Sequence, residues 1–224
     1  MSKPILSILR VFTLALIAYF LVLGLSDHIN LTTADLGRHI MNGKYIVDAF
    51  VNTKDFFTQT PLYTNFYSYT SPDFAVHNHH WLTGVIHYLT HESYGFVGLS
   101  ILNIAVIVIG VLLVFVAAAM LGGYEFAACA LAVSMPLLVW RDEVRPESFS
   151  YLLIAAEFLI LTLFRFNKLS FRTTAILLAQ FQLLWINLHV FFCIGLLTIG
   201  FFYLEEAIKS KSLFKWKAGH YAWL

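Results

Sequence analysis

The sequence predicts an all-α polytopic membrane protein: a bundle of about six transmembrane helices, with amphipathic surface helices in a long first extracytoplasmic loop. Hydrophobic residues make up 59% and charged residues 12% of the chain, whereas soluble domains average about half apolar and a quarter charged. The apolar residues also gather in runs that approach the length needed to cross a bilayer. Together with the placement of the basic residues, these observations predict a single transmembrane module covering residues 1–224.

The apolar runs follow one another closely, except after the first. They cover residues 7–25, 96–121, 126–140, 149–166, 173–188 and 190–204. Asn187 and His189 separate the last two runs, and a turn is favoured there because one long helix would bury both polar residues in the hydrocarbon core. Lys3 and Arg10 beside the first run also fit a cleaved leader. In a chain with further spans, we expect a retained anchor instead.

Basic residues indicate the orientation of the spans. Nine of the fourteen lysines and arginines fall on one side: Lys3, Arg10, Arg165, Lys168, Arg172, Lys209, Lys211, Lys215 and Lys217. The positive-inside rule makes this side cytoplasmic, so both chain ends are predicted to lie inside an inner or plasma membrane. The loop of residues 26–95 and the turn at residues 187–189 then share the extracytoplasmic side. A net charge of +1 without basic clusters argues against a nucleic acid partner.

The first outer loop is too long for a simple connection and needs structure of its own. Apolar residues from Leu36 to Phe50 recur at three- and four-residue steps, which predicts an amphipathic helix on the membrane surface. Asp35, Arg38 and His39 share one face of this helix, where a carboxylate beside a cation and an imidazole suits a general base. Alternatively, Asp35 only complements the helix N-terminus and Arg38 only reaches lipid headgroups.

Three histidines lie close together in the stretch HNHHWL, residues 77–82. Neither an extended nor a helical backbone brings all three to one point, and no fourth ligand follows at metal-binding spacing, so zinc is not favoured. Trp81 is predicted to anchor a second surface helix at the membrane interface. His79 and His80 then either line an outer cleft opposite Asp35 or cap this helix.

Five stretches of the chain form an ordered set of motifs. They are ADLGRHIMNGKYI (34–46), TNFYSYTSPDF (64–74), NHHWLTGVIHYL (78–89), RPESFSYLL (145–153) and LLWINLHVFF (183–192). In this order they resemble the N-terminal half of bacterial membrane glycosyltransferases of the GT-C type. That group includes protein O-mannosyltransferases and lipid A aminoarabinose transferases. The resemblance covers most of the chain, from Asp35 to about Phe192.

The resemblance implies transfer of a sugar from a polyprenyl-phosphate donor to a glycan, lipid or protein acceptor outside the cytoplasm. It also implies an acid after the first span as catalytic base or metal ligand, and Asp35 matches this acid by position, with His39 as the second catalytic candidate. The group often has two adjacent acids here, whereas residue 34 is alanine, which weakens the case for a divalent metal ion. His80 replaces a residue that is often acidic in the group. The group has ten or more spans, so we expect either a fragment or the membrane module alone.

Cleavage of a sugar-phosphate bond leaves negative charge on the lipid phosphate and calls for fixed positive charge. Arg145, at the outer end of the fourth span, is the predicted phosphate ligand, although it could instead pair with a neighbouring acid. The predicted substrate-binding residues are Arg38, His79, His80, Arg145, Asn187 and His189. The last two could equally satisfy backbone groups where two helices meet.

The sequence leaves two alternatives to a glycosyltransferase open. Glu157 lies near the middle of the fourth span, where an ionisable residue suggests a transporter or flippase path. A protonated Glu157 bonded to Gln180 or Gln182 would explain it without transport. The chain could also be a non-catalytic module of an envelope assembly. The sequence favours the transferase because its polar residues cluster in the outer segments rather than along a path through the spans.

Overall fold

The computed structural model describes residues 3–26, 29, 35–52, 60–65, 68–71, 73–140 and 143–209 of the protein. This part of the chain contains helices and no strands, which confirms the all-α class. The described helices are α1 (Lys3–Leu25), α2 (Leu36–Asn52), α3 (Trp81–Gly122), α4 (Tyr124–Val139), α5 (Glu147–Arg165), α6 (Phe171–Leu188) and α7 (Phe192–Lys209).

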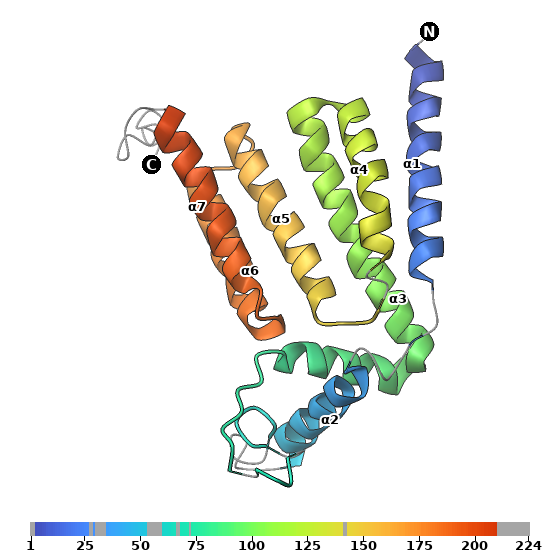
Figure 1. The fold of residues 1–224 in the computed structure, drawn as a ribbon. Coiled ribbons are helices and arrows are strands. Elements are labelled where there is room, and N and C mark those ends of the chain that lie inside the picture. The colour runs from blue at the N-terminus through green and yellow to red at the C-terminus, as the bar shows by residue number, and fades with distance from the viewer. Residues whose placement is uncertain are drawn as a thin grey trace.

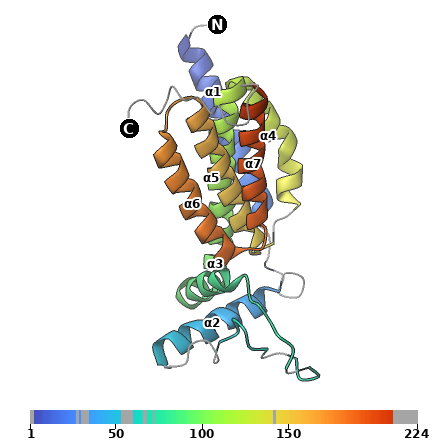
Figure 2. The ribbon, with the colours of Figure 1, turned by 90° about the vertical axis from the view of Figure 1, so that its left-hand side faces the viewer.

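The long helices stand side by side in what we call the main bundle: α1, the part of α3 after Gly95, and α4 to α7 (Figure 1). The N-terminus, the α3–α4 turn, the α5–α6 turn and the end of α7 lie at one end of this bundle. The start of α5 and the α6–α7 turn lie at the other end, which also carries α2 and the first part of α3 (Figure 2). We call this second end the α2 end.

Three of the described helices are long and apolar enough to cross a membrane: Pro4–Leu25, Trp81–Gly122 and Glu147–Arg165. Tyr124–Val139 is a shorter apolar helix. Large apolar side chains on the outside of the bundle are well exposed, as Phe12 (63%) and Leu137 (77%) illustrate. Such a surface suits lipid better than water, so the chain has the character of a membrane protein. Every predicted apolar run forms a helix or lies mostly within one.

The long helix α3 changes direction at Gly95, where the backbone has φ 61° and ψ −157°. Side chains other than that of glycine rarely tolerate this conformation. Residues 81–94 lie across the α2 end, whereas residues 96–122 run along the main bundle (Figures 1 and 2). The break falls at the predicted boundary between a surface helix and an apolar span.

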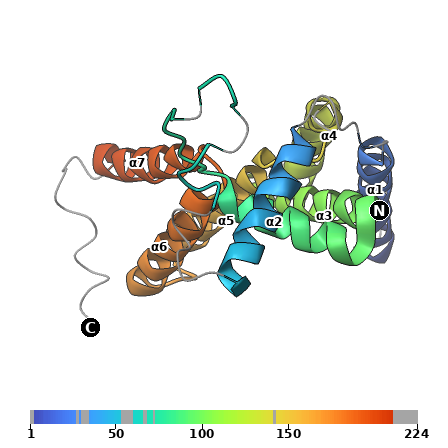
Figure 3. The same ribbon diagram turned by 90° about the horizontal axis from the view of Figure 1, so that it is seen from below.

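α2 crosses the first part of α3 at two glycines (Figure 3). A Cβ atom placed on Gly43 would lie only 2.0 Å from the carbonyl oxygen of Gly84, so the two backbones are in direct contact. The face of α2 at this crossing is fully buried and includes Leu36 (0% exposed) and Ile46 (3%). This face shares Leu36 and Gly43 with the predicted apolar stripe, whereas Phe50, which ends that stripe, is 80% exposed.

The first part of α3 is attached to the main bundle by polar contacts. The indole Nε1 of Trp81 donates to Oδ1 of Asn187 at 2.9 Å, and the hydroxyl of Thr83 donates to the carbonyl of Leu188 at 2.8 Å. An apolar cluster that includes Val106 from α3, Phe149 from α5 and Trp185 from α6 lies beside these bonds. These contacts bring α2, α3, α5 and α6 together at one place, next to the predicted site residues.

Candidate functional site

A cavity of about 720 Å³ lies between α2 and the segment that leads into α3. Arg38, His39 and Asn42 of α2 form one wall. The other wall comes from the described residues between positions 61 and 80, His79 and His80 among them. The volume lies within the range of about 300–1,000 Å³ typical of small-molecule sites. The structure therefore brings four predicted site residues to one cavity, although α2 and HNHHWL are about forty positions apart in the chain.

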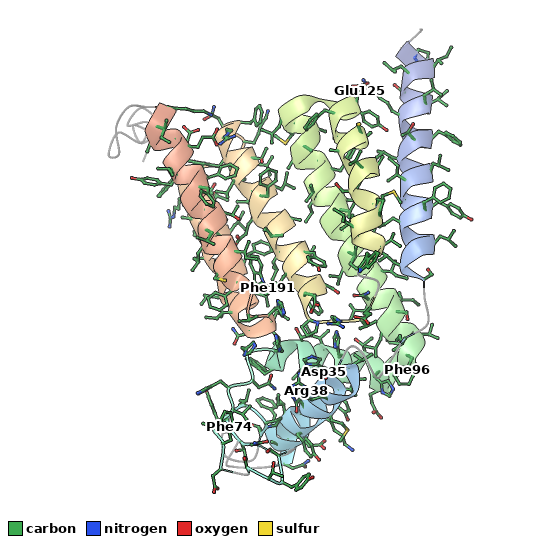
Figure 4. The ribbon with its side chains drawn as sticks, viewed as in Figure 1. Asp35, Arg38, Phe74, Phe96, Glu125 and Phe191 are labelled. Carbon is green, nitrogen blue, oxygen red and sulfur yellow. The ribbon has the colours of Figure 1, made fainter. Side chains whose placement is uncertain are left out.

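Asp35 lies beside this cavity rather than among the residues that line it. Its carbonyl accepts the hydrogen bond from the backbone N–H of His39, at 3.1 Å, which begins α2. Its carboxylate accepts a hydrogen bond of 2.9 Å from Nη2 of Arg38. Both side chains are more than half exposed (Figure 4). Asp35 is therefore accessible to a bound molecule. Of the three residues predicted to share one face, Asp35 and Arg38 form an ion pair on the exposed side, whereas His39 is on the buried side of α2.

His39 is buried, with 4% of its surface exposed. Burial, with the neighbouring His87 and Arg38, lowers its pKa from 6.5 to about 3, and Asp35 acts in the opposite direction. The ring of His39 makes edge contacts with those of His80 and His87, at centroid distances of 5.5 and 6.4 Å. His39 is therefore a neutral imidazole at pH 7, able to accept a proton at one nitrogen and donate one at the other.

His80 stacks on His189, with ring centroids 4.9 Å apart and planes inclined by 23°. It also contacts His79, at 4.1 Å between centroids. Burial, together with the neighbouring His79 and His189, lowers the pKa of His80 to about 3. The His80 side chain makes no capping bond to α3, so it does not act as a side-chain cap of that helix. His79 and His80 both line the cavity, and His80 does so as a neutral imidazole.

His189 supports His80 from behind the cavity wall. The indole of Trp185 donates to Oγ of Ser150 at 2.7 Å, and this hydroxyl lies 2.8 Å from Nδ1 of His189. Because an indole can only donate, the Ser150 hydroxyl accepts from Trp185, and its own hydrogen is free to point at Nδ1 of His189. Nε2 faces Glu147 Oε2 at 3.9 Å. His189 is held in one orientation and does not itself line the cavity.

Arg145 and Asn187 also lie outside the lining of the cavity. Arg145 pairs with Glu143 at 2.5 Å and lies 3.8 Å from Glu147. Asn187 receives the hydrogen bond from Trp81 and donates one to the carbonyl of Leu183 at 2.7 Å. These contacts correspond to the local alternatives that the sequence left open for both residues. Their substrate-binding roles stay predictions.

The histidines touch one another as packed rings. Within the part of the chain that the structure describes, no group of three or more His, Cys, Asp or Glu side chains is arranged to hold a metal ion. The neutral imidazoles of His39 and His80 and the Asp35–Arg38 pair therefore contribute to the electrostatic character of the cavity.

Sequence reasoning missed several residues of this site. Asn42, Asn65, Tyr69 and Asn78 line the cavity, and they carried no signal beyond the polar composition of their segments. His87 is buried (2% exposed) against His39. It follows His80 by seven positions, which is two helical turns, so the spacing alone could have placed both on one face of α3.

The geometry of this cavity is the evidence on which any functional assignment rests. No protein-family model, curated protein or solved structure matches the chain.

Proposed function

We propose that the protein is a membrane glycosyltransferase of the GT-C type, which transfers a sugar from a polyprenyl-phosphate donor to an acceptor on the extracytoplasmic side. The observation that carries this proposal is the cavity between α2 and the segment leading into α3. It combines one cation, Arg38, with two neutral imidazoles, His39 and His80, and an exposed carboxylate, Asp35, lies at its side.

These groups suit the chemistry of glycosyl transfer. The bond between the sugar carbon and the phosphate oxygen breaks, and the electron pair leaves with the lipid phosphate, where Arg38 would stabilise the charge. The acceptor oxygen forms the new bond to the sugar carbon and gives up its proton. Asp35 is the proposed general base. His39, four residues further along the chain, is the proposed second proton acceptor.

The proposed reaction needs the α2 end to face away from the cytoplasm. We propose that α1, the part of α3 after Gly95, and α4 to α7 all cross the membrane, with both chain ends inside. The N-terminus and the end of α7 lie at the same end of the main bundle, which supports this topology (Figure 1). Single cysteines at Asp48 and Asn167, labelled with a membrane-impermeant maleimide on intact cells, test it. Asp48 should react and Asn167 should not, and the reverse pattern would overturn the orientation.

The test of the reaction is turnover of a polyprenyl-phosphate-linked sugar by membranes containing the full chain. Asp35→Asn should reduce the rate by a factor of about 10²–10⁴, the usual contribution of a general base. Asp48→Asn is the matched control, because Asp48 is an exposed aspartate on the same helix. Equal rates in the two variants would remove Asp35 from the role of base.

One observation favours a second function, transport. Glu157 on α5 is fully buried, and its Oε1 accepts a hydrogen bond of 2.9 Å from Gln182 on α6, whereas its Oε2 has no partner among the described residues. If the chain moves a substrate across the membrane, Glu157→Gln should abolish that movement while Asp35→Asn has little effect. For a transferase the two variants should show the opposite pattern.

A further inference from the structure

The cavity between α2 and the segment leading into α3 has an unusual chemical lining. Six of its fourteen described lining residues are asparagine, serine or threonine, four are histidine, and Arg38 is the one lysine or arginine among them. None of those residues is a carboxylate. The positive charge of Arg38 is balanced by Asp35 at 2.9 Å, and His39 and His80 are neutral at pH 7. The cavity is therefore polar but nearly uncharged.

Two buried polar atoms of the lining residues have no hydrogen-bond partner among the described residues: Nδ2 of Asn78 and Nε2 of His80. Buried polar atoms are nearly always paired, because leaving one without a partner is costly. The Asn78 side chain is fixed at its other end, since Oδ1 accepts the backbone N–H of His80 at 3.2 Å. The amide can only donate at Nδ2, and the imidazole can donate or accept at Nε2. A hydroxyl group can bond either atom, because it is donor and acceptor at once.

Tyr69 adds an aromatic surface to the same cavity. It is among the lining residues, and 92% of its surface is exposed. An aromatic ring left open at a polar cavity offers an apolar face to a ligand that also makes hydrogen bonds. Sugars combine a C–H face with many hydroxyl groups, so they match a ring next to amides and imidazoles.

We infer that this cavity binds an uncharged saccharide, through the amide of Asn78, the imidazole of His80 and the ring of Tyr69, and that this saccharide is the acceptor of the transfer. The role as acceptor rests on the proposed function, whereas the binding of a neutral sugar rests on the cavity alone. The single cation, Arg38, would remain for the phosphate of the donor.

The lining disfavours the other classes of acceptor. A cationic amino sugar needs a carboxylate, and Asp35, which lies beside the lining, is already paired with Arg38. A sugar with several phosphate or carboxylate groups needs several cations, and the described lining provides only Arg38. A peptide that binds by strand addition would need an open sheet edge, and the described residues contain no strand.

The inference can be tested by binding, without turnover. The full chain is placed in lipid nanodiscs, which avoids sugar-headed detergents, and applied to an array of neutral, acidic and amine-bearing glycans. We expect binding to neutral glycans. The affinity for the best neutral glycan is then measured by calorimetry for the wild type and for variants.

Asn78→Asp keeps the oxygen that accepts from His80 but replaces the donor with a negative charge, so the affinity should fall at least about tenfold. Tyr69→Ala should have a similar effect, whereas Tyr69→Phe should bind like the wild type because the ring remains. Asn167→Asp is the matched control for the first change, since Asn167 is exposed at the other end of the bundle. Tyr69 is so exposed that its removal leaves the fold intact, which keeps the test decisive even where Asn78→Asp misfolds.

Preference for acidic or amine-bearing glycans, binding to none of the three classes, or unchanged affinity in both Asn78→Asp and Tyr69→Ala would each overturn the inference. The proposed function fails separately. If neutral glycans bind as expected but receive no sugar from a polyprenyl-phosphate donor, the proposed transferase activity is wrong. The inference that the cavity binds a neutral saccharide would still hold.

Discussion

The close contact between Gly43 and Gly84 predicts how much stability the α2–α3 crossing loses when Gly43 is replaced by alanine. An alanine Cβ at position 43 would lie 2.0 Å from the Gly84 carbonyl oxygen and 2.4 Å from its carbon, whereas real Cβ contacts stay above 3.0 Å. Both neighbouring atoms are backbone, so α2 and α3 must move apart by about 1 Å, and overpacking of this kind costs about 1–3 kcal/mol. The higher helix propensity of alanine offsets this cost by at most about 1 kcal/mol. Gly43→Ala should therefore destabilise the crossing by about 0–2 kcal/mol when the full propensity gain is realised and by up to about 3 kcal/mol without it.

Two further glycines provide a graded series. At Gly84 the nearest atom to an added Cβ is the His39 carbonyl oxygen at 2.9 Å, so Gly84→Ala should be milder. At Gly37, on the same helix, nothing lies within 4 Å, and Gly37→Ala should be neutral or slightly stabilising. Hydrogen exchange in nanodiscs, followed by mass spectrometry, should show faster exchange across residues 36–52 in Gly43→Ala but unchanged exchange across α5. Equal protection of α2 in Gly43→Ala and Gly37→Ala would refute the close crossing.

Three other predictions concern buried polar groups. The pKa of His39 is about 3 in the folded chain and 6.5 when unfolded, so the unfolded state binds more protons between these values. Acidification from pH 7 to 5 should cost about 2 kcal/mol of unfolding free energy through His39 alone, and His80 and His87, whose pKa values are also lowered, add to the loss. Thermal unfolding at a series of pH values measures this loss, and His39→Asn should reduce the slope. Ser150→Ala leaves an indole and an imidazole without their shared partner and should cost about 1–3 kcal/mol, whereas the exposed Ser134→Ala should be neutral in the same assay. Glu157→Gln keeps an acceptor for Gln182, so its melting temperature should match that of the wild type, and a large fall would mean that the carboxyl group itself is needed for stability.

The sequence by itself determined the helices and part of the site. Long apolar runs have few ways to satisfy their backbone other than a helix, so the runs became α1, the later part of α3, and α4 to α7. The stripe from Leu36 to Phe50 predicted α2, and the step of three residues predicted the Asp35–Arg38 pair. These are local properties, set by the 3.6-residue period and by the chemistry of neighbouring side chains.

Only the tertiary structure decided which distant residues meet. His80 stacks on His189, more than a hundred positions away, because Trp81 and Thr83 bind the end of α6. His39 joins them because α2 crosses α3 on two glycines. The neutral state of these rings is likewise a tertiary property, since it comes from burial and from the histidines on other segments. A sequence pattern fixes which face of a helix a side chain occupies, whereas the crossing of two helices depends on contacts summed over the whole fold.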